Sequence, residues 1–119
     1  MASEITYQFQ TLLSNGDLSD SYASNSQSAD QSSALLIRNV QNIGFAADEA
    51  LALGDVTTPG WAVFQNLDDT NFVEIGVGSF TPFLKLKPGE QCVCRLGTTA
   101  PRAQADTAAV DLFYIIYSD

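Results

Sequence analysis

Two pairs of neighbouring acidic residues are the groups in this chain best suited to acid–base or metal chemistry. Asp68-Asp69 lies in the stretch LDDTNF, and Asp48-Glu49 lies in AADEAL. Two carboxylates can together hydrolyse a glycosidic bond, and a set of six or more oxygens can hold Ca²⁺. Adjacent residues of a strand point in opposite directions, however, and DDTN lacks the spacing of a calcium loop. Neither pair therefore predicts a catalytic or metal site.

The DDTN stretch has instead the composition of a turn. Aspartate and asparagine side chains accept hydrogen bonds from backbone N–H groups one or two residues further along the chain, which stabilises tight turns. We therefore predict that residues 68–71 form a hairpin turn between the strand that contains Trp61 and the strand that contains Phe72.

Nucleophilic and redox chemistry is poorly supported. The sequence has no histidine and two cysteines, so no triad of serine or cysteine with histidine can form. Cys92 and Cys94 are two residues apart, which in a strand separates their Cα atoms by about 6.5–7 Å, at or beyond the limit for a disulfide. A zinc site would need further ligands. We expect Cys92, Cys94 and Leu96 to face the core, no cofactor to be bound, and no enzymatic activity.

The single tryptophan has two interpretations. An exposed Trp61 could stack on a sugar ring, together with an exposed Tyr7 or Tyr22. Its alternation with Val63 is, however, more typical of a core residue, and we predict that Trp61 is buried.

Composition limits the classes of partner. A chain of 119 residues with 45% hydrophobic content is long enough for one domain with a real core. Its formal net charge is −9, from 14 acidic and 5 basic side chains, which disfavours binding to nucleic acid or to an anionic membrane. The first residues, MASEITYQFQ, carry neither a basic nor an apolar segment, so we expect no secretory signal and synthesis in a cytoplasm.

The hydrophobic pattern predicts an all-β fold. Apolar residues alternate with polar ones along most segments, and turn signals lie between them at Asn15-Gly16, Pro59-Gly60 and Pro88-Gly89. About eight to ten short strands at this spacing indicate an antiparallel β-sandwich or barrel. We interpret residues 1–119 as one β-sandwich domain, in which residues 46–53 form a strand or turn rather than a helix.

A serine-rich polar tract interrupts this pattern at about residues 19–33. It is a flexible linker, an exposed edge strand or a mobile arm, and the composition does not distinguish these. Exposed edge strands invite pairing with another chain, so we hypothesise that the N-terminal strand and this tract reach a neighbouring subunit or another protein.

The last strand, VDLFYIIYS, is apolar on both faces. A sandwich strand is normally polar on its outer face. Val110, Leu112, Tyr114 and Ile116 would share one face. Phe113, Ile115 and Tyr117 would share the other, and we predict that these three form an oligomer interface.

From Leu53 to Asp119 the chain resembles small virion proteins of tailed bacteriophages. The resemblance rests on the order of LGDVTTPGWAVFQNLDDTNFVEIGV, FLKLKPGEQCVCRLG and AQADTAAVDLFYIIYSD. The shared elements are a Leu-Gly-Asp, a Pro-Gly turn before an aromatic strand, Asn-Leu-Asp, Asn-aromatic-Val-Glu, an LKPGE turn and a final apolar strand.

This resemblance implies a jelly-roll-like sandwich that decorates the phage head. Such a decoration, or cement, protein would form a homotrimer and bridge subunits of the major capsid protein on the capsid surface, after synthesis in the host cytoplasm. The alternative is a module of the tail or fibre that recognises glycans on the host surface.

Overall fold

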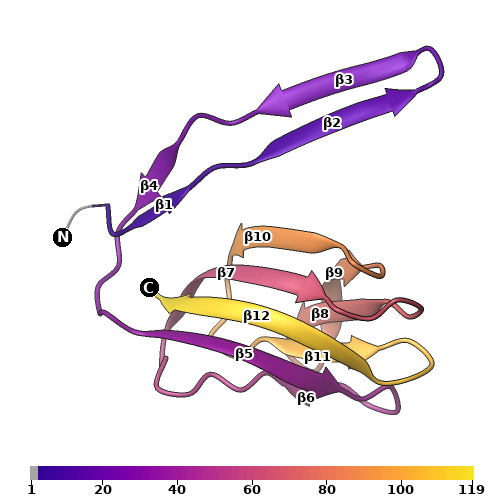
Figure 1. Cartoon of the computed structure of the whole chain (residues 1–119). Coiled ribbons are helices and arrows are strands. Elements are labelled where there is room, and N and C mark those ends of the chain that lie inside the picture. The colour runs from indigo at the N-terminus through magenta and orange to yellow at the C-terminus, as the bar shows by residue number, and fades with distance from the viewer. Residues whose placement is uncertain (1–2) are drawn as a thin grey trace. The chain divides into compact units, whose positions relative to one another are not determined.

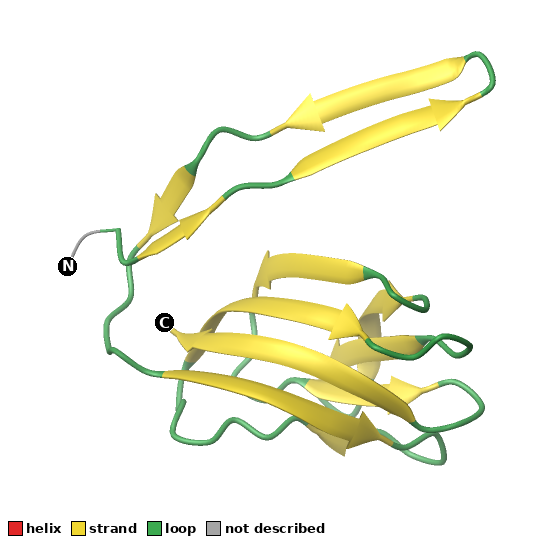
Figure 2. Cartoon of the chain, viewed as in Figure 1, coloured by secondary structure: helices red, strands yellow, loops and turns green. Residues whose placement is uncertain are grey.

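The computed structural model describes residues 3–119, and within this range it contains strands and no helix (Figures 1 and 2). No helix able to cross a membrane therefore occurs among these residues.

The chain divides into two compact units, Met1–Ser32 and Ser33–Asp119. The first unit contains β1 (Ile5–Tyr7), β2 (Gln10–Asn15), β3 (Leu18–Ala23) and β4 (Gln27–Ala29). The second contains β5 (Leu36–Ile43), β6 (Glu49–Ala50), β7 (Pro59–Asn66), β8 (Val73–Val77), β9 (Thr81–Leu86), β10 (Gln91–Arg95), β11 (Arg102–Ala105) and β12 (Val110–Ser118).

The second unit is an antiparallel β-sandwich of two four-stranded sheets. One sheet has the order β5-β12-β7-β10 and the other β6-β11-β8-β9. Consecutive strands lie in different sheets, except for β8 and β9, which pair as a hairpin. This is the strand order of an eight-stranded jelly roll. The predicted all-β, jelly-roll-like sandwich is therefore confirmed, with eight strands in the sandwich and four more in the first unit.

Alternate residues of the strands fill the space between the two sheets. In β7, for example, Ala62 and Phe64 are fully buried, whereas Val63 and Gln65 on the opposite face are half-buried. This period of two is what a pleated strand imposes on its side chains. The largest fully buried side chains are Tyr114, Phe64, Ile43, Ile75, Leu112 and Ile116.

Strand β5 has polar as well as apolar residues on its inner face, where Ile37 and Ile43 pack in the core. Asn39 and Gln41 are on its inner face, where the buried Tyr114 hydroxyl accepts a hydrogen bond from Asn39 Nδ2 at 3.1 Å. The same hydroxyl lies 3.0 Å from Gln41 Oε1 and 2.7 Å from the Ala52 carbonyl oxygen, so it has acceptors for its own proton. The inward polar groups therefore have hydrogen-bond partners, and the alternation of the strand places Leu36, Arg38, Val40 and Asn42 on the outer face.

The turn at residues 68–71 is not a hairpin, so that prediction is wrong. Both edges of β7 are occupied by β10 and β12, and β8 pairs with β9 and β11 in the other sheet. The segment therefore crosses from one sheet to the other. Fully buried Asn66 holds the crossing in place: its Nδ2 donates to the carbonyl oxygens of Asn71 at 2.9 Å and Leu86 at 3.0 Å, and its Oδ1 accepts the Asp68 N–H at 2.8 Å.

The two predicted Pro-Gly turns have different outcomes. Pro88-Gly89 forms a turn, with Gly89 at a φ of 78° and the Glu90 N–H donating to the Lys87 carbonyl at 3.0 Å. Pro59 and Gly60 instead begin β7. A Cβ at Gly60 would lie 2.9 Å from the Asp119 Cα, so the glycine here allows close approach of two backbones and does not make a turn.

The first unit is a long β-ribbon that turns at the predicted Asn15-Gly16. Gly16 has a φ of 57° and is the first of two loop residues between β2 and β3, as a type II′ hairpin requires. The polar tract predicted at about residues 19–33 contains most of β3 and all of β4. It therefore forms one side of this ribbon, and the unit extends over the first 32 residues rather than the tract alone.

Gly76 offers a direct test of the β8–β9 packing. A Cβ there would lie 2.6 Å from the Thr81 carbonyl oxygen and 2.9 Å from the Pro82 Cα, at a point where the register of the two strands shifts. We expect Gly76→Ala to lower the free energy of unfolding by about 1–3 kcal/mol, because the backbone of β9 must move. Urea unfolding followed by Trp61 fluorescence measures this.

Gly97→Ala is the matched control. Gly97 is exposed in a loop, and a Cβ there meets no atom within 4 Å. Equal unfolding free energies for the two variants would contradict the close approach at Gly76.

Candidate functional site

The carboxylates of the sheet-crossing turn are engaged with their own backbone. Asp68 accepts the N–H groups of Thr70 at 3.0 Å and Asn71 at 2.6 Å, and Asp69 accepts the Thr70 hydroxyl at 2.9 Å. The backbone N–H of Asn71, and then that of Thr70, lowers the pKa of Asp68 from its ordinary value. The predicted role of these acids in shaping a turn is therefore confirmed. Residues 3–119 contain no group of three or more residues that could ligate a metal.

The second acidic pair is bound to structural partners. Asp48 forms an ion pair with Arg102 of β11. Glu49 accepts a hydrogen bond from Gln41 Nε2 at 3.0 Å and from the Gly44 N–H at 3.1 Å. These contacts tie the short β6 to β5 and β11, and the two carboxylates do not converge on a common point.

The two cysteines pack against the core, as predicted. Cys92 and Cys94 are free thiols on the inner side of β10 and are half-buried, and Leu96 beyond them is buried. Burial, and then the charge of the neighbouring Cys92, raise the pKa of Cys94 to about 12. A thiol with so high a pKa is almost entirely protonated near neutral pH and is a poor nucleophile.

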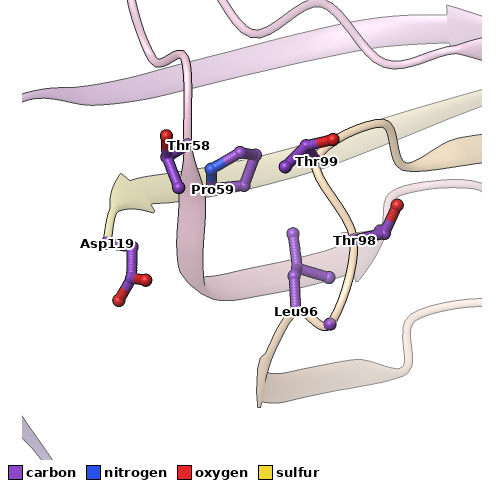
Figure 3. A pocket seen from close by; sticks show the side chains of 7 residues that line it. Thr58, Pro59, Leu96, Thr98, Thr99 and Asp119 are labelled. Atoms are coloured by element: carbon purple, nitrogen blue, oxygen red, sulfur yellow. The ribbon is translucent and has the colours of Figure 1, made fainter.

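One open recess lies at the end of the sandwich where β7 begins and β10 ends (Figure 3). Its volume is about 480 Å³. Its lining offers threonine hydroxyls and one carboxylate, that of Asp119, which is held by Arg95 at 2.8 Å. The residues that line it are Thr58, Pro59, Leu96, Gly97, Thr98, Thr99 and Asp119. This set contains neither a nucleophile with a base nor a convergent pair of acids.

The most distinctive surface is the outer face of the β5-β12-β7-β10 sheet, which we call the outer face. The predicted interface residues Phe113, Ile115 and Tyr117 lie together on it, along the central strand β12. Phe113 and Tyr117 are half-buried by the neighbouring strands, and Ile115 is 8% exposed. The strand pattern places the three side chains on one face of β12 with the exposed Asp111, and their role in an interface stays a prediction.

Neighbouring strands extend this apolar surface on both sides. In one row across the sheet, Ile115 is paired with Val63 of β7, which is paired with Val93 of β10. In the next row Phe113 is paired with Val40 of β5. The side chains of Leu36, Val40 and Val93 are 56%, 51% and 48% exposed.

Sequence reasoning missed these neighbours. Leu36 and Val40 alternate in β5 with Ile37, Asn39 and Gln41, so the pattern alone does not tell which face of the strand is buried. Val93 lies on the outer side of β10 because Cys92 and Cys94 on either side of it face the core, but nothing in the sequence placed it in a row with Ile115.

Trp61 corrects another prediction. It lies on the outer face, half-buried, and not in the core, which is filled at this point by Ala62 and Phe64. The Arg95 guanidinium lies 5.6 Å from the centre of its ring, within the range of a cation–π contact. The alternation that grouped Trp61 with Val63 was correct, but their shared face is the outer one.

Comparison of the chain with protein-family models, with curated proteins and with solved structures finds no match. The interpretation of the outer face therefore depends on its own chemistry. It is a broad surface with aromatic and aliphatic side chains at its centre. Its polar residues are Arg38, Arg95, Asp111, Asn42, Gln65 and Gln91. Contiguous exposed apolar surface of this kind is a common feature of interaction sites in other proteins.

The lowered pKa of Asp68 predicts a pH-dependent contribution to stability. Because the folded state holds the carboxylate ionised, this stabilisation is fully present above the ordinary aspartate pKa of about 3.9. It is lost as the pH falls through the lowered pKa of Asp68. We expect Asp68→Asn to be less stable than the wild type at neutral pH, and the difference to shrink in strongly acidic buffer. Urea unfolding at both pH values measures this.

Asp69→Asn is the control, since the Asp69 carboxylate accepts the Thr70 hydroxyl and not the backbone N–H groups bound by Asp68. A stability difference between the wild type and Asp68→Asn that stays constant with pH would contradict this role of Asp68.

Proposed function

We propose that this protein is a non-enzymatic structural subunit of a tailed-bacteriophage particle. It acts as a decoration protein that binds the capsid surface and bridges subunits of the major capsid protein, most simply as a homotrimer. The observation that carries the proposal is the apolar outer face of the sandwich. Contiguous exposed apolar surface of this kind marks protein–protein interaction sites.

The other sheet supports this assignment by contrast. Its outward-facing residues include the cross-strand set Lys85, Glu74 and Gln104, and the ion pair of Arg102 with Asp48. A soluble sandwich normally has polar residues on both outer faces. The β5-β12-β7-β10 sheet differs in that apolar side chains pair across its four strands, Val40 with Phe113 and Ile115 with Val63 and Val93, between polar positions such as Arg38 and Gln65.

The electrostatics and the chemistry of the remaining sites agree with a scaffold role. A net charge of −9 disfavours nucleic acid and anionic membranes as partners. The carboxylates of Asp48, Glu49 and Asp68 are bound to structural partners, and the thiols of Cys92 and Cys94 pack against the core. The resemblance of residues 53–119 to phage virion proteins supports the particle as the location.

A decoration protein of this size can stabilise a shell through the free energy of many repeated contacts. A typical protein–protein interface buries roughly 1,600 Å² in total. A shell repeats each contact many times, and a protein that binds the assembled state shifts the equilibrium toward that state by mass action. A small, rigid sandwich therefore reinforces a large particle without catalytic chemistry.

A glycan-binding module of the tail or fibre is the second candidate. It is favoured by the exposed Tyr22, whose ring is 5.7 Å from that of Phe9, and by the partly exposed Trp61. Tyr7 is half-buried. Aromatic rings of this kind stack on sugars, and a shift of Trp61 fluorescence on addition of host oligosaccharide would favour this candidate.

Particle composition tests the proposal. We expect quantitative mass spectrometry of purified particles to find many copies of this chain, and to find them with the heads after heads and tails are separated. Heads stripped of the protein should release DNA at a lower temperature than intact heads, and adding back the purified chain should restore the difference. A few copies that stay with the tails would contradict decoration and would support the glycan-binding module.

A further inference from the structure

Strand β10 has a neighbouring strand along one edge. It is the outermost strand of the β5-β12-β7-β10 sheet, and within residues 3–119 it pairs with β7 alone (Figure 1). Just beyond its end, the Leu96 N–H donates to the Gly60 carbonyl oxygen of β7 at 2.8 Å. Antiparallel ladders alternate, so Cys92 and Cys94 also exchange hydrogen bonds with β7. The residues whose backbone groups point away from β7 are Gln91, Val93 and Arg95.

Strand β10 also has no device that prevents pairing along this edge. Proline, register shifts and very short length are the common ones. Strand β9, at an edge of the other sheet, contains Pro82 and a register shift, and β6 has two residues. Strand β10 contains no proline, and its ladder with β7 is regular.

The open edge of β10 is complementary to itself. In an antiparallel pair of two such strands, one register uses all three outward residues. It places Val93 opposite Val93 of the second copy and Gln91 opposite Arg95. Each residue pair exchanges two backbone hydrogen bonds, and no two charges of the same sign are opposite each other. The apolar row of Ile115, Val63 and Val93 then continues into the second copy.

The same register brings the cysteines of two copies together. Cys92 of one copy becomes opposite Cys94 of the other, on the inner side of the joined sheet. Such non-hydrogen-bonded pairs have Cα atoms about 4.5 Å apart, within the range of about 4.4–6.8 Å for a disulfide. Within one strand, residues two apart have Cα atoms about 6.5–7 Å apart. The register therefore favours a disulfide between copies over one within a copy.

Strand β5, at the other edge of the same sheet, is less complementary to itself. Its ladder with β12 leaves the backbone groups of Leu36, Arg38, Val40 and Asn42 pointing outward. The antiparallel register that uses all four residues places Arg38 of one copy opposite Val40 of the other. An apolar row therefore ends at this junction, whereas it continues across a junction of two β10 strands.

We propose that two copies of this chain pair through β10, antiparallel and around a two-fold axis at Val93, so that their four-stranded sheets become one continuous sheet. The second copy is the partner because a two-fold axis matches each donor and acceptor of the strand with its own counterpart. The pairing concerns the isolated protein and does not rest on the proposed function. In the homotrimer proposed above, it would join one trimer to the next.

Disulfide formation in the full-length chain tests the register. Diamide takes up the two thiol hydrogens as each disulfide forms and is itself reduced to the hydrazine. Burial raises the pKa of the Cys94 thiol to about 12, so the link requires this added oxidant. We expect a covalent dimer on a non-reducing gel, reversed by a reductant, in which peptide mass spectrometry finds Cys92 joined to Cys94.

Cys92→Ser and Cys94→Ser form a matched pair of variants. Each variant alone brings a serine opposite its remaining thiol and should give little covalent dimer. In an equimolar mixture, Cys92 of one variant meets Cys94 of the other, and the covalent dimer should return. Covalent dimer that is as abundant in each variant alone as in the mixture would contradict the register.

Val93→Pro tests the backbone pairing by sedimentation velocity. Proline removes an N–H that points away from β7, so the two central hydrogen bonds of the contact are lost and self-association should weaken by about tenfold. Val40→Pro is the matched control, because its N–H points outward from the other edge of the sheet, and it should sediment as the wild type does. Near-ultraviolet circular dichroism establishes that both variants are folded.

Three results would overturn the proposal. A wild type that gives no covalent dimer, or that sediments as a monomer or trimer at every concentration, has no contact through β10. Equal linking of the single cysteine variants and their mixture assigns the contact to another register. Weakening by Val40→Pro and not by Val93→Pro assigns it to β5. Particle composition, which tests capsid decoration, is independent of all three.

Discussion

The structure depends on the pairing of β12 between β5 and β7. This nine-residue strand has a neighbour along both edges, and its inner residues Leu112, Tyr114 and Ile116 are fully buried between the sheets. A strand with both edges paired and one face in the core has a single surface left, and here that surface is made of Phe113, Ile115 and Tyr117. Fixing the core therefore also fixes an apolar outer face, which the chain has too little material to cover within the sandwich.

The rest of the molecule is arranged around this constraint. The polar network of Tyr114 with Asn39 and Gln41 satisfies the inward polar groups of β5 and leaves Val40 outside. Buried Asn66 holds the crossing to the second sheet, whose outer residues include Glu74 and Lys85. The β5-β12-β7-β10 sheet therefore presents contiguous apolar side chains on its outer face, among polar ones, and surfaces of this kind are common at protein–protein interfaces.

Local patterns in the sequence predicted the class of fold and several turns, because period-two alternation and residues such as Gly16 and Gly89 act over short distances. The pairing of strands that are distant in the sequence could not be predicted from these local patterns. The turn at Asp68 was recognised, but its role as a sheet crossing depends on β10 and β12, which come later in the chain. Trp61 was grouped correctly with Val63 and assigned to the wrong side, since alternation fixes which residues share a face and not which face is buried. The outer face as a whole could not be predicted, because it is assembled from four strands distant in sequence.

Trp61, the single tryptophan of the chain, reports directly on the central claim that the outer face is covered in the assembled protein. The measurement is the quenching of its fluorescence by acrylamide in dilute protein, in concentrated protein and on the purified particle. We predict that quenching decreases severalfold as the protein assembles, because the half-exposed ring loses contact with solvent. Quenching that stays the same in all three samples would contradict the assignment of the outer face as an assembly surface.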